Sequence, residues 1–339
     1  MTRQIHSMFA FAAVPSRMPR LAAAAAAAAL LLCTRAAEAA PPTIVFVGSS
    51  VTWGYTEVED FGVGTVTDLN GCTQTVGGCK VIGGVPALFK SFAHQVGLDY
   101  DVYMEMIPGS SLTQHYDTER AVLDRAWDEV VMNGQTTLDF AAPGDPMRVT
   151  SDTNLLGTMW QARNPKVRVN LLSTWSRADL VYATPGNPWY GTQIYEMGKY
   201  VQAGYEFAAV ANPTIHPNVI PVGLAWNRAM ADGIADPNPY DGITPGMVDL
   251  WRSGIPPESS NNYHASRFGS YLEALVVFGS VTGVDPSRLG PHEKAAAALN
   301  ITPSQARDLQ EVAARQLRET ADAERAAKAA SVTARLPRR

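Results

Sequence analysis

Alternating strand-like and helix-like segments are the feature that most restricts the fold of this 339-residue chain. Short apolar, β-branched runs favour strands buried on both faces, and the longer segments between them place apolar residues at helical spacing. The strand-like runs are Thr43–Val47, Tyr100–Ile107, Glu129–Met132, Val167–Ser173 and Val219–Val222. The helix-like segments are Pro86–Val96, Thr118–Trp127, Asn154–Ala162, Ile194–Val210 and Phe268–Val281. This order predicts a three-layer α/β/α sandwich with a mostly parallel, flavodoxin-like sheet of about five strands.

The first forty residues have a different character from the rest of the chain. Arg17 and Arg20 precede an apolar run, Leu21–Cys33, and Ala37-Glu38-Ala39 follows as a small-x-small pattern. This arrangement is typical of a secretory signal peptide over residues 1–40, although a retained N-terminal anchor is the alternative. The apolar run is shorter than the roughly 20 residues that span a bilayer, so we expect no stable membrane insertion after cleavage. The expected location is secreted or periplasmic.

Charge and composition narrow the class of protein. Residues 41–339 hold 23 basic and 31 acidic residues, a formal net charge of −8. The chain lacks a basic patch for phosphate backbones, which disfavours nucleic-acid binding. Hydrophobic residues make up 46% of the chain, enough for a large core. We expect one domain over residues 41–290 and a C-terminal helical tail over 291–339.

Two cysteines remain after the expected cleavage site. Cys72 and Cys79 lie close together in a glycine-rich segment. In an exported chain such a pair favours a disulfide, with two free thiols as the alternative. A metal site needs more ligands than this loop offers, so we expect neither a metal nor a cofactor.

Small and polar residues follow the strand-like runs, where a parallel sheet places its ligands. Ser50 comes directly after the first run, Gly109 after the second, and the amides of Asn133 and Gln135 after the third. His264 precedes the last apolar helix, in a polar loop. A hydroxyl, an imidazole and several N–H donors are the groups that acyl transfer needs. Taken singly, each is also compatible with an ordinary turn or a solvated side chain.

The combination, in this order, resembles the SGNH (GDSL-like) hydrolase superfamily, and more narrowly its exported bacterial members whose serine block reads Gly-Asn-Ser-Phe-Thr. The resemblance runs from about Thr43 to Gly283. Its most specific parts are the serine block, Gly48–Gly54, and the histidine block, Asn261–Leu272. The further matching stretches are Ser110–His115, Trp127–Val131, Thr174-Trp175, Pro221–Trp226 and Gly269–Leu272.

The resemblance implies a role for each of these residues. Ser50 is then the nucleophile and His264 its base. The oxyanion hole consists of the N–H groups of Ser50 and Gly109 and a side-chain amide. Gln135 matches the amide position best, and Asn133 is the alternative.

The chain departs from the superfamily pattern at three positions. Ser49 precedes the nucleophile where Asp or Asn is usual, and Gln135 stands where the pattern has Asn. Asn261 occupies the place of the acid in the Asp-x-x-His block. An Asn can orient an imidazole but cannot stabilise its positive charge, so Asp241 or Asp249 is an alternative partner for His264. A Ser–His dyad without any acid is a third arrangement.

The expected activity is hydrolysis of carboxylic esters through an acyl-enzyme, on a small-molecule or polysaccharide ester such as a carbohydrate O-acetyl group. Aromatic side chains in the loops either stack on a sugar or anchor the loops; they are Trp53, Tyr55, Trp175, Trp189 and Tyr190. Asn261 motivates a rival hypothesis, a catalytically degenerate carbohydrate-binding protein on the same fold. A purely structural envelope protein is the third alternative.

Overall fold

A six-stranded, fully parallel sheet lies at the centre of the fold, in the order β2-β5-β1-β6-β7-β8. Its strands are β1 (Thr43–Gly48), β2 (Thr67–Asp68), β5 (Asp101–Met106), β6 (Glu129–Met132), β7 (Arg168–Leu172) and β8 (Asn218–Ile220). The central strand β1 pairs with β5 from Thr43↔Asp101 to Gly48↔Met106. It is buried along most of its length, as its continuous apolar run predicts.

The structure is a computed structural model that describes residues 40–75, 77–252 and 263–335. The predicted signal peptide, apart from its last residue, and the candidate Asn261 lie outside the described residues. The chain from Pro41 onward groups into one compact unit.

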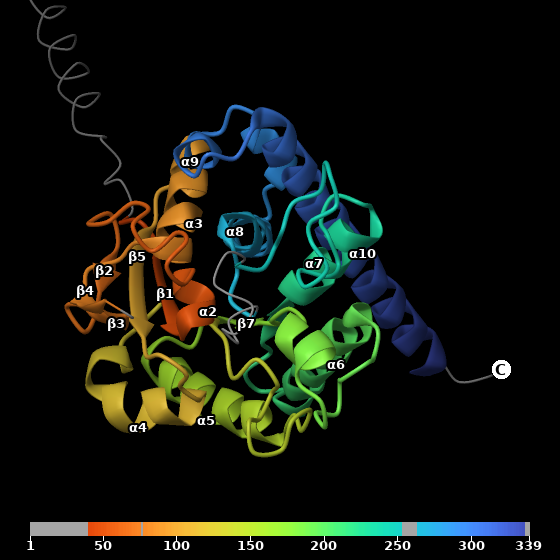
Figure 1. Cartoon of the computed structure of the whole chain (residues 1–339). Coiled ribbons are helices and arrows are strands. Elements are labelled where there is room, and N and C mark those ends of the chain that lie inside the picture. The colour runs from red at the N-terminus through yellow and green to blue at the C-terminus, as the bar shows by residue number, and fades with distance from the viewer. Residues whose placement is uncertain (1–39, 76, 253–262, 336–339) are drawn as a thin grey trace, which may run out of the picture. The chain divides into compact units, whose positions relative to one another are not determined.

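Helices cover both faces of the sheet (Figure 1). The helices are α2 (Ser50–Trp53), α3 (Gly84–Gln95), α4 (Leu112–Leu123), α5 (Met147–Arg163), α6 (Ile194–Ala211), α7 (Val222–Ala231), α8 (Arg267–Thr282), α9 (Lys294–Ala298) and α10 (Pro303–Arg335), with a π-helical turn η1 (Asp179–Ala183) and a 3-10 turn η2 (Pro286–Leu289). Helices α3 and α8 pack together on one face, and α4, α5 and α6 form a row on the other. The predicted α/β/α sandwich is therefore confirmed.

Four predicted elements need correction. Helix α5 begins at Met147 rather than at Asn154. The sheet has a sixth strand, β2, which is two residues long and therefore too short to give an alternating pattern. Helix α4 begins at Leu112 rather than Thr118, because the Ser111 side chain caps it by accepting the N–H of Gln114. The last strand ends at Ile220, and Val222 starts α7, a helix that was not predicted; Pro221 separates the two elements.

A small hairpin stands beside the main sheet. Strands β3 (Thr73–Thr75) and β4 (Gly78–Lys80) pair antiparallel, and a disulfide joins Cys72 to Cys79. The predicted disulfide is thus present. It closes the glycine-rich segment at the edge of the sheet that carries β2 (Figure 1).

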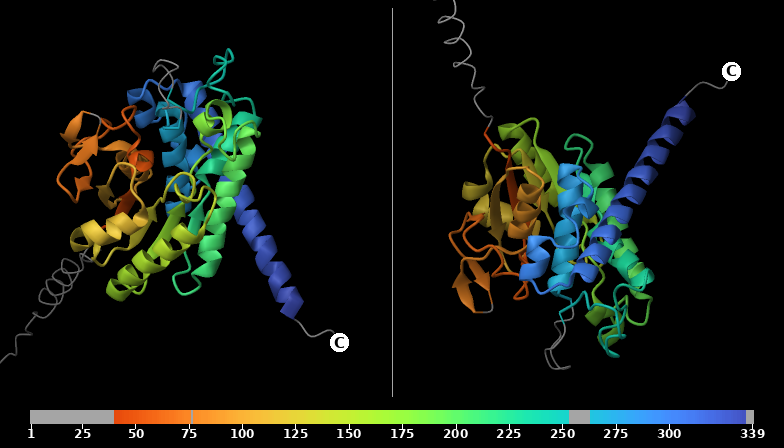
Figure 2. Two further views of the ribbon diagram at one scale, coloured as in Figure 1. Left: turned by 60° about the horizontal axis from the view of Figure 1, so that its bottom comes forward. Right: turned by 90° about the horizontal axis from the view of Figure 1, so that it is seen from above.

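The C-terminal segment contributes to the core. The first half of α10 packs on α8, and its Leu309, Val312 and Ala313 side chains are buried. The second half, from Asp322 to Ala330, is exposed and extends away from the helices that the first half contacts (Figure 2).

The topology brings the candidate residues to one edge of the sheet. Strand β1 has β5 on one side and β6 on the other, so the connections leave it in opposite directions. The loops after these three strands carry Ser50, Gly109 and Gln135. The carboxyl ends at such a switch point are where open α/β sheets bind ligands.

Candidate active site

Ser50 is the first residue of α2, directly after β1. The preceding Ser49 has extended backbone, and its carbonyl accepts the N–H groups of Thr52 and Trp53. This sharp strand-to-helix turn leaves the Ser50 side chain half-buried at the edge of a cleft of about 510 Å³. A hydroxyl in this position is accessible to a bound ester.

His264 faces Ser50, although 213 residues separate them in sequence. Its Nε2 lies 2.9 Å from Ser50 Oγ, and the ring is buried, with 2% of the residue exposed. When Ser50 donates to Nε2, the ring proton resides on Nδ1. Among the residues that the structure describes, Nδ1 has no hydrogen-bond partner.

Two tyrosines enclose the His264 ring. Tyr55 stacks on one side with 3.6 Å between ring centroids and 5° between planes. Tyr263 contacts it at 3.9 Å and 36°. Behind these rings lie two guanidinium groups, Arg252 at 5.3 Å from Tyr55 and Arg177 at 4.1 Å from Tyr263. We call these five residues the His264 stack.

The surroundings of His264 disfavour its charged form. Burial first, and then the positive charges of Arg177 and Arg252, lower the pKa of His264 from 6.5 to about 3. Each arginine has its own counterion, Asp179 for Arg177 and Glu57 for Arg252. His264 is therefore a neutral base across the neutral and mildly acidic range.

Neither proposed aspartate forms a hydrogen bond with the His264 ring in the described part of the chain. Asp249 accepts the N–H of Trp251 at 2.9 Å, and Asp241 accepts from the Asn238 amide at 2.8 Å. Asn261 lies outside the described residues.

Gly109 is the exposed tip of the turn after β5. Its φ of +65° is in the left-handed region that favours glycine, and a Cβ there would meet nothing within 4 Å. The conformation, rather than crowding, thus requires a glycine. Gly109 lines the same cleft as Ser50 and His264.

A second serine–histidine pair fixes this turn. Ser110 Oγ donates to the carbonyl of Ile107 at 2.9 Å and lies 2.7 Å from Nε2 of His115. Nδ1 of the same ring bonds the buried carboxyl group of Glu105. These contacts connect the Gly109 turn to β5 and α4, so the pair braces that turn. Sequence reasoning missed it, although Ser110 and His115 lie in a matching stretch.

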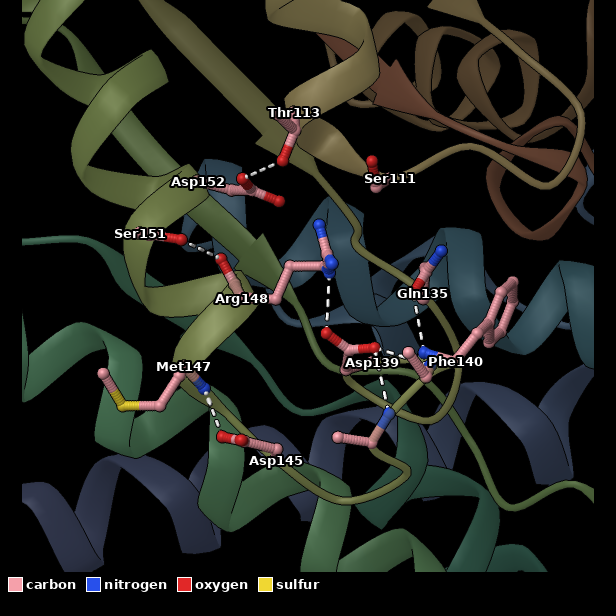
Figure 3. Close-up of polar contacts among 12 residues, drawn as sticks. Ser111, Thr113, Gln135, Asp139, Phe140, Asp145, Met147, Arg148, Ser151 and Asp152 are labelled. Atoms are coloured by element: carbon pink, nitrogen blue, oxygen red, sulfur yellow. Dashed lines mark hydrogen bonds and ion pairs between the residues drawn. The ribbon is translucent and has the colours of Figure 1, made fainter.

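Gln135 and Asn133 differ in where their amides point. The Gln135 oxygen accepts the N–H of Phe140 at 2.8 Å, which leaves its amide nitrogen for the cleft (Figure 3). Asn133 is buried, its nitrogen donates to the Gly134 carbonyl, and its oxygen accepts from Thr52. Only Gln135 of the two lines the cleft.

The loop that carries Gln135 is anchored by a carboxylate. Asp139 accepts the N–H groups of Ala141 and Ala142 and pairs with Arg148 of α5 at 2.7 Å (Figure 3). These contacts hold the loop against a helix that packs on the sheet, so the Gln135 side chain is attached to rigid structure.

The aromatic residues named from the sequence separate into two groups. Trp53 and Tyr55 line the cleft. Trp175 and Trp189 are buried, and Trp175 stacks on Trp226 at 4.4 Å. Tyr190 is exposed and does not line this cleft. Two of the five rings are therefore placed to face a ligand, and two are buried where they anchor loops.

Within the described residues, no group of three or more His, Cys, Asp or Glu side chains is arranged to hold a metal ion. None of the helices in that same part combines the length and apolar character needed to cross a bilayer.

Comparison with known proteins identifies the fold. No family model and no curated protein matches the chain. A DUF4886 family protein from Bacteroides uniformis superposes with a TM-score of 0.56 at 15% identity, over 82% of this chain and 95% of that one. An extracellular lipase from Streptomyces rimosus gives a TM-score of 0.43 at 11% identity, over 71% and 99% of the two chains. A Geobacillus acetyl-xylooligosaccharide esterase gives 0.40 at 13% identity, over 71% and 92%. At such identities the likeness concerns the fold.

Proposed function

We propose that this protein is a serine esterase that hydrolyses a small acyl ester, with carbohydrate O-acetyl groups as the first substrate class to test. The observation that carries the proposal is the 2.9 Å contact between Ser50 Oγ and His264 Nε2 at the edge of a cleft. The resemblance of the serine and histidine blocks to the SGNH superfamily supports it independently of the geometry.

The mechanism follows from the donors and acceptors in the cleft. His264 Nε2 accepts the Ser50 proton as the oxygen attacks the ester carbonyl. The oxyanion receives hydrogen bonds from the N–H groups of Ser50 and Gly109 and from the Gln135 amide. The protonated His264 gives its proton to the leaving alcohol. A water activated by the same ring then releases the acid from Ser50.

The test compares the full chain with three serine variants, using p-nitrophenyl acetate between pH 5 and 9 and a fluorophosphonate probe. We expect Ser50→Ala to abolish both turnover and covalent labelling. Ser151 lies on α5 with its hydroxyl bonded to a backbone carbonyl, so Ser151→Ala is the matched control and should retain both. Labelling that survives in Ser50→Ala and disappears in Ser110→Ala would show that Ser110, and not Ser50, is the nucleophile.

A second candidate function follows from the His264 Nδ1 atom, which lacks a partner among the described residues. Without an acid, the site would suit a carbohydrate-binding protein that has lost its turnover. Equal, negligible rates in the wild type and Ser50→Ala, together with binding of an acetylated oligosaccharide, would favour this function.

We also propose that the protein is exported to the periplasm or beyond the cell, through a signal peptide over residues 1–40. The Cys72–Cys79 disulfide supports this proposal, because such bonds persist mainly in oxidising compartments. N-terminal sequencing of the protein from the culture medium or periplasm tests it, with cleavage after about residue 40 as the expected result.

A further inference from the structure

The orientation of the His264 ring is the feature of the site that the described hydrogen bonds explain least. In a Ser-His-Asp triad, the acid fixes the ring by accepting the Nδ1 proton. Here that atom has no hydrogen-bond partner among the described residues. The ring nevertheless points its Nε2 at Ser50. Two aromatic rings contact the imidazole in the described part of the chain, and they restrict its orientation.

The His264 stack supplies this contact. Tyr55 is nearly parallel to the imidazole at 3.6 Å, and Tyr263 closes the opposite side at 3.9 Å. A flat ring between two others cannot tilt without losing contact with one of them, so its remaining freedom is rotation within its own plane. The bond to Ser50 sets that rotation.

The stack has a positive charge behind each tyrosine. Arg252 lies over Tyr55 and Arg177 over Tyr263, each attracted to the electron-rich ring face. These cations oppose protonation of His264, whereas a triad carboxylate would favour it. Two carboxylates lie next to the stack, and each is paired with one of its arginines: Glu57 with Arg252 and Asp179 with Arg177.

We propose that Tyr55 and Tyr263 position the His264 ring by stacking on it, and that burial together with Arg177 and Arg252 keeps it a neutral base in acidic solution. This inference rests on the proposed esterase function. It makes the tyrosines positioning residues, since they act on the reaction through His264. The expected consequence is an esterase that stays active well below pH 6.

The first test separates the ring of Tyr55 from its hydroxyl. Acetate release from p-nitrophenyl acetate is measured from pH 4 to 8 for the full chain and two variants. Tyr55→Phe keeps the ring, and Tyr55→Leu removes it. We expect Tyr55→Phe to stay within about twofold of the wild type, and Tyr55→Leu to lose about tenfold or more in kcat with little change in KM. The acid limb of the Tyr55→Leu profile should also move to higher pH, because water reaches the ring.

The second test removes a charge and keeps the rings. Arg252→Gln should move the acid limb to higher pH and leave the plateau kcat within about threefold of the wild type. A wild-type acid limb near pH 6.5 would contradict the proposal. So would a Tyr55→Leu profile that matches Tyr55→Phe, or a tenfold loss confined to Asn261→Ala.

A readout without turnover separates this inference from the proposed function. The ¹⁵N shifts of the His264 ring report its tautomer and its titration directly. We expect a neutral ring protonated on Nδ1 down to about pH 4 in the wild type, and a higher midpoint in Tyr55→Leu and Arg252→Gln. If turnover is absent but these shifts behave as expected, the esterase function fails and the positioning role stands. If His264 titrates near pH 6.5 in the wild type, Tyr55→Leu and Arg252→Gln, the surroundings do not keep the ring neutral and the proposal fails.

Discussion

The two polar atoms of the Gln135 amide have different neighbours. Its oxygen is held by the N–H of Phe140, and its nitrogen remains for the cleft. Replacement by Glu keeps an acceptor for Phe140, removes the donor and adds a negative charge where an oxyanion would form. A single substitution thus tests the donor while the loop keeps its anchor.

We expect Gln135→Glu to lower kcat about 100-fold or more, with the melting temperature nearly unchanged. Asn133→Asp is the comparison at the buried amide: it should destabilise the fold, because its lost nitrogen donates to the Gly134 carbonyl. Steady-state kinetics and thermal melts measure both effects. A kcat for Gln135→Glu within threefold of the wild type would remove Gln135 from the oxyanion hole.

At the residue scale, the sequence predicted which side chains gather and left open how they are held. The blocks after β1, β5 and β6 have their own local signals in glycine, serine and amide residues. The His264 stack has no such local signal. Arg177 lies 87 positions before His264 in the sequence, and its contact with Tyr263 exists only in the folded chain. The choice between Gln135 and Asn133 likewise depended on which amide faces the cleft.

At the scale of elements, the disulfide hairpin contributes to the cleft without carrying a residue proposed for chemistry. Gln74 and Thr75 of this hairpin line the same cleft as Ser50 and His264. Because the bond closes a short loop, its loss should cost about 2–3 kcal/mol in the chain-entropy model. Looser hairpin residues would bind substrate less well without changing the distance from Ser50 to His264.

We therefore expect the double variant Cys72→Ala, Cys79→Ala to raise KM and leave kcat nearly unchanged. Chemical denaturation should show the lower free energy of unfolding. Wild-type protein treated with a mild reductant provides the matched control, and it should shift KM in the same direction. A loss confined to kcat would mean that the hairpin supports the catalytic groups themselves.

Helix α8 carries an acid that the proposed mechanism does not use. Glu273 is fully buried, and burial raises its pKa well above 4.5. Neither carboxyl oxygen has a hydrogen-bond partner among the described residues. The unfolded chain releases this proton near pH 4.5, but the native state holds it. Glu273 thus stabilises the fold most below pH 4.5, and this stability is lost as pH rises towards the raised pKa.

Glu273→Gln should accordingly change stability in a pH-dependent way. The difference in unfolding free energy between variant and wild type should grow in favour of the variant by about 1.4 kcal/mol per pH unit above pH 4.5, until the native pKa is reached. Denaturant unfolding at pH 4, 6 and 8 measures it. The exposed Glu311→Gln on α10 is the control, with no such slope expected. A constant difference across this range would show that Glu273 ionises normally in the fold.

Element boundaries were predictable where a pattern was long and uninterrupted. The apolar run of β1 and the helical spacing of α6 gave bounds within one residue of the structure. Helix α4 was misplaced because its first turn, in which Leu112 and His115 are buried, follows a serine cap that looks like loop sequence. Strand β2 has two residues and therefore no period to detect.

For the whole molecule, the C-terminal helix α10 has a buried first half and an exposed second half. Sequence analysis separated residues 291–339 as a helical tail. In the structure, Leu309, Val312 and Ala313 of α10 are buried against the rest of the unit. Arg315 and Arg318 add ion pairs with Asp232 and Asp285. The second half of α10 has no comparable burial from Asp322 to Ala330.

Two truncations distinguish a structural helix from a dispensable tail. A chain that ends at Arg325 keeps every side chain of α10 that is buried in the described part of the chain, so its melting temperature should fall by no more than about 2 °C. A chain that ends at Thr302 uncovers the apolar side of α8, and burial of three or four such side chains is worth roughly 5–8 kcal/mol, comparable to the whole stability of a domain. We expect this second chain to be insoluble or to melt without a cooperative transition, as calorimetry and circular dichroism would show. If it instead melts cooperatively within a few degrees of the parent, the sandwich is complete without α10, and the boundary predicted at residue 290 is correct.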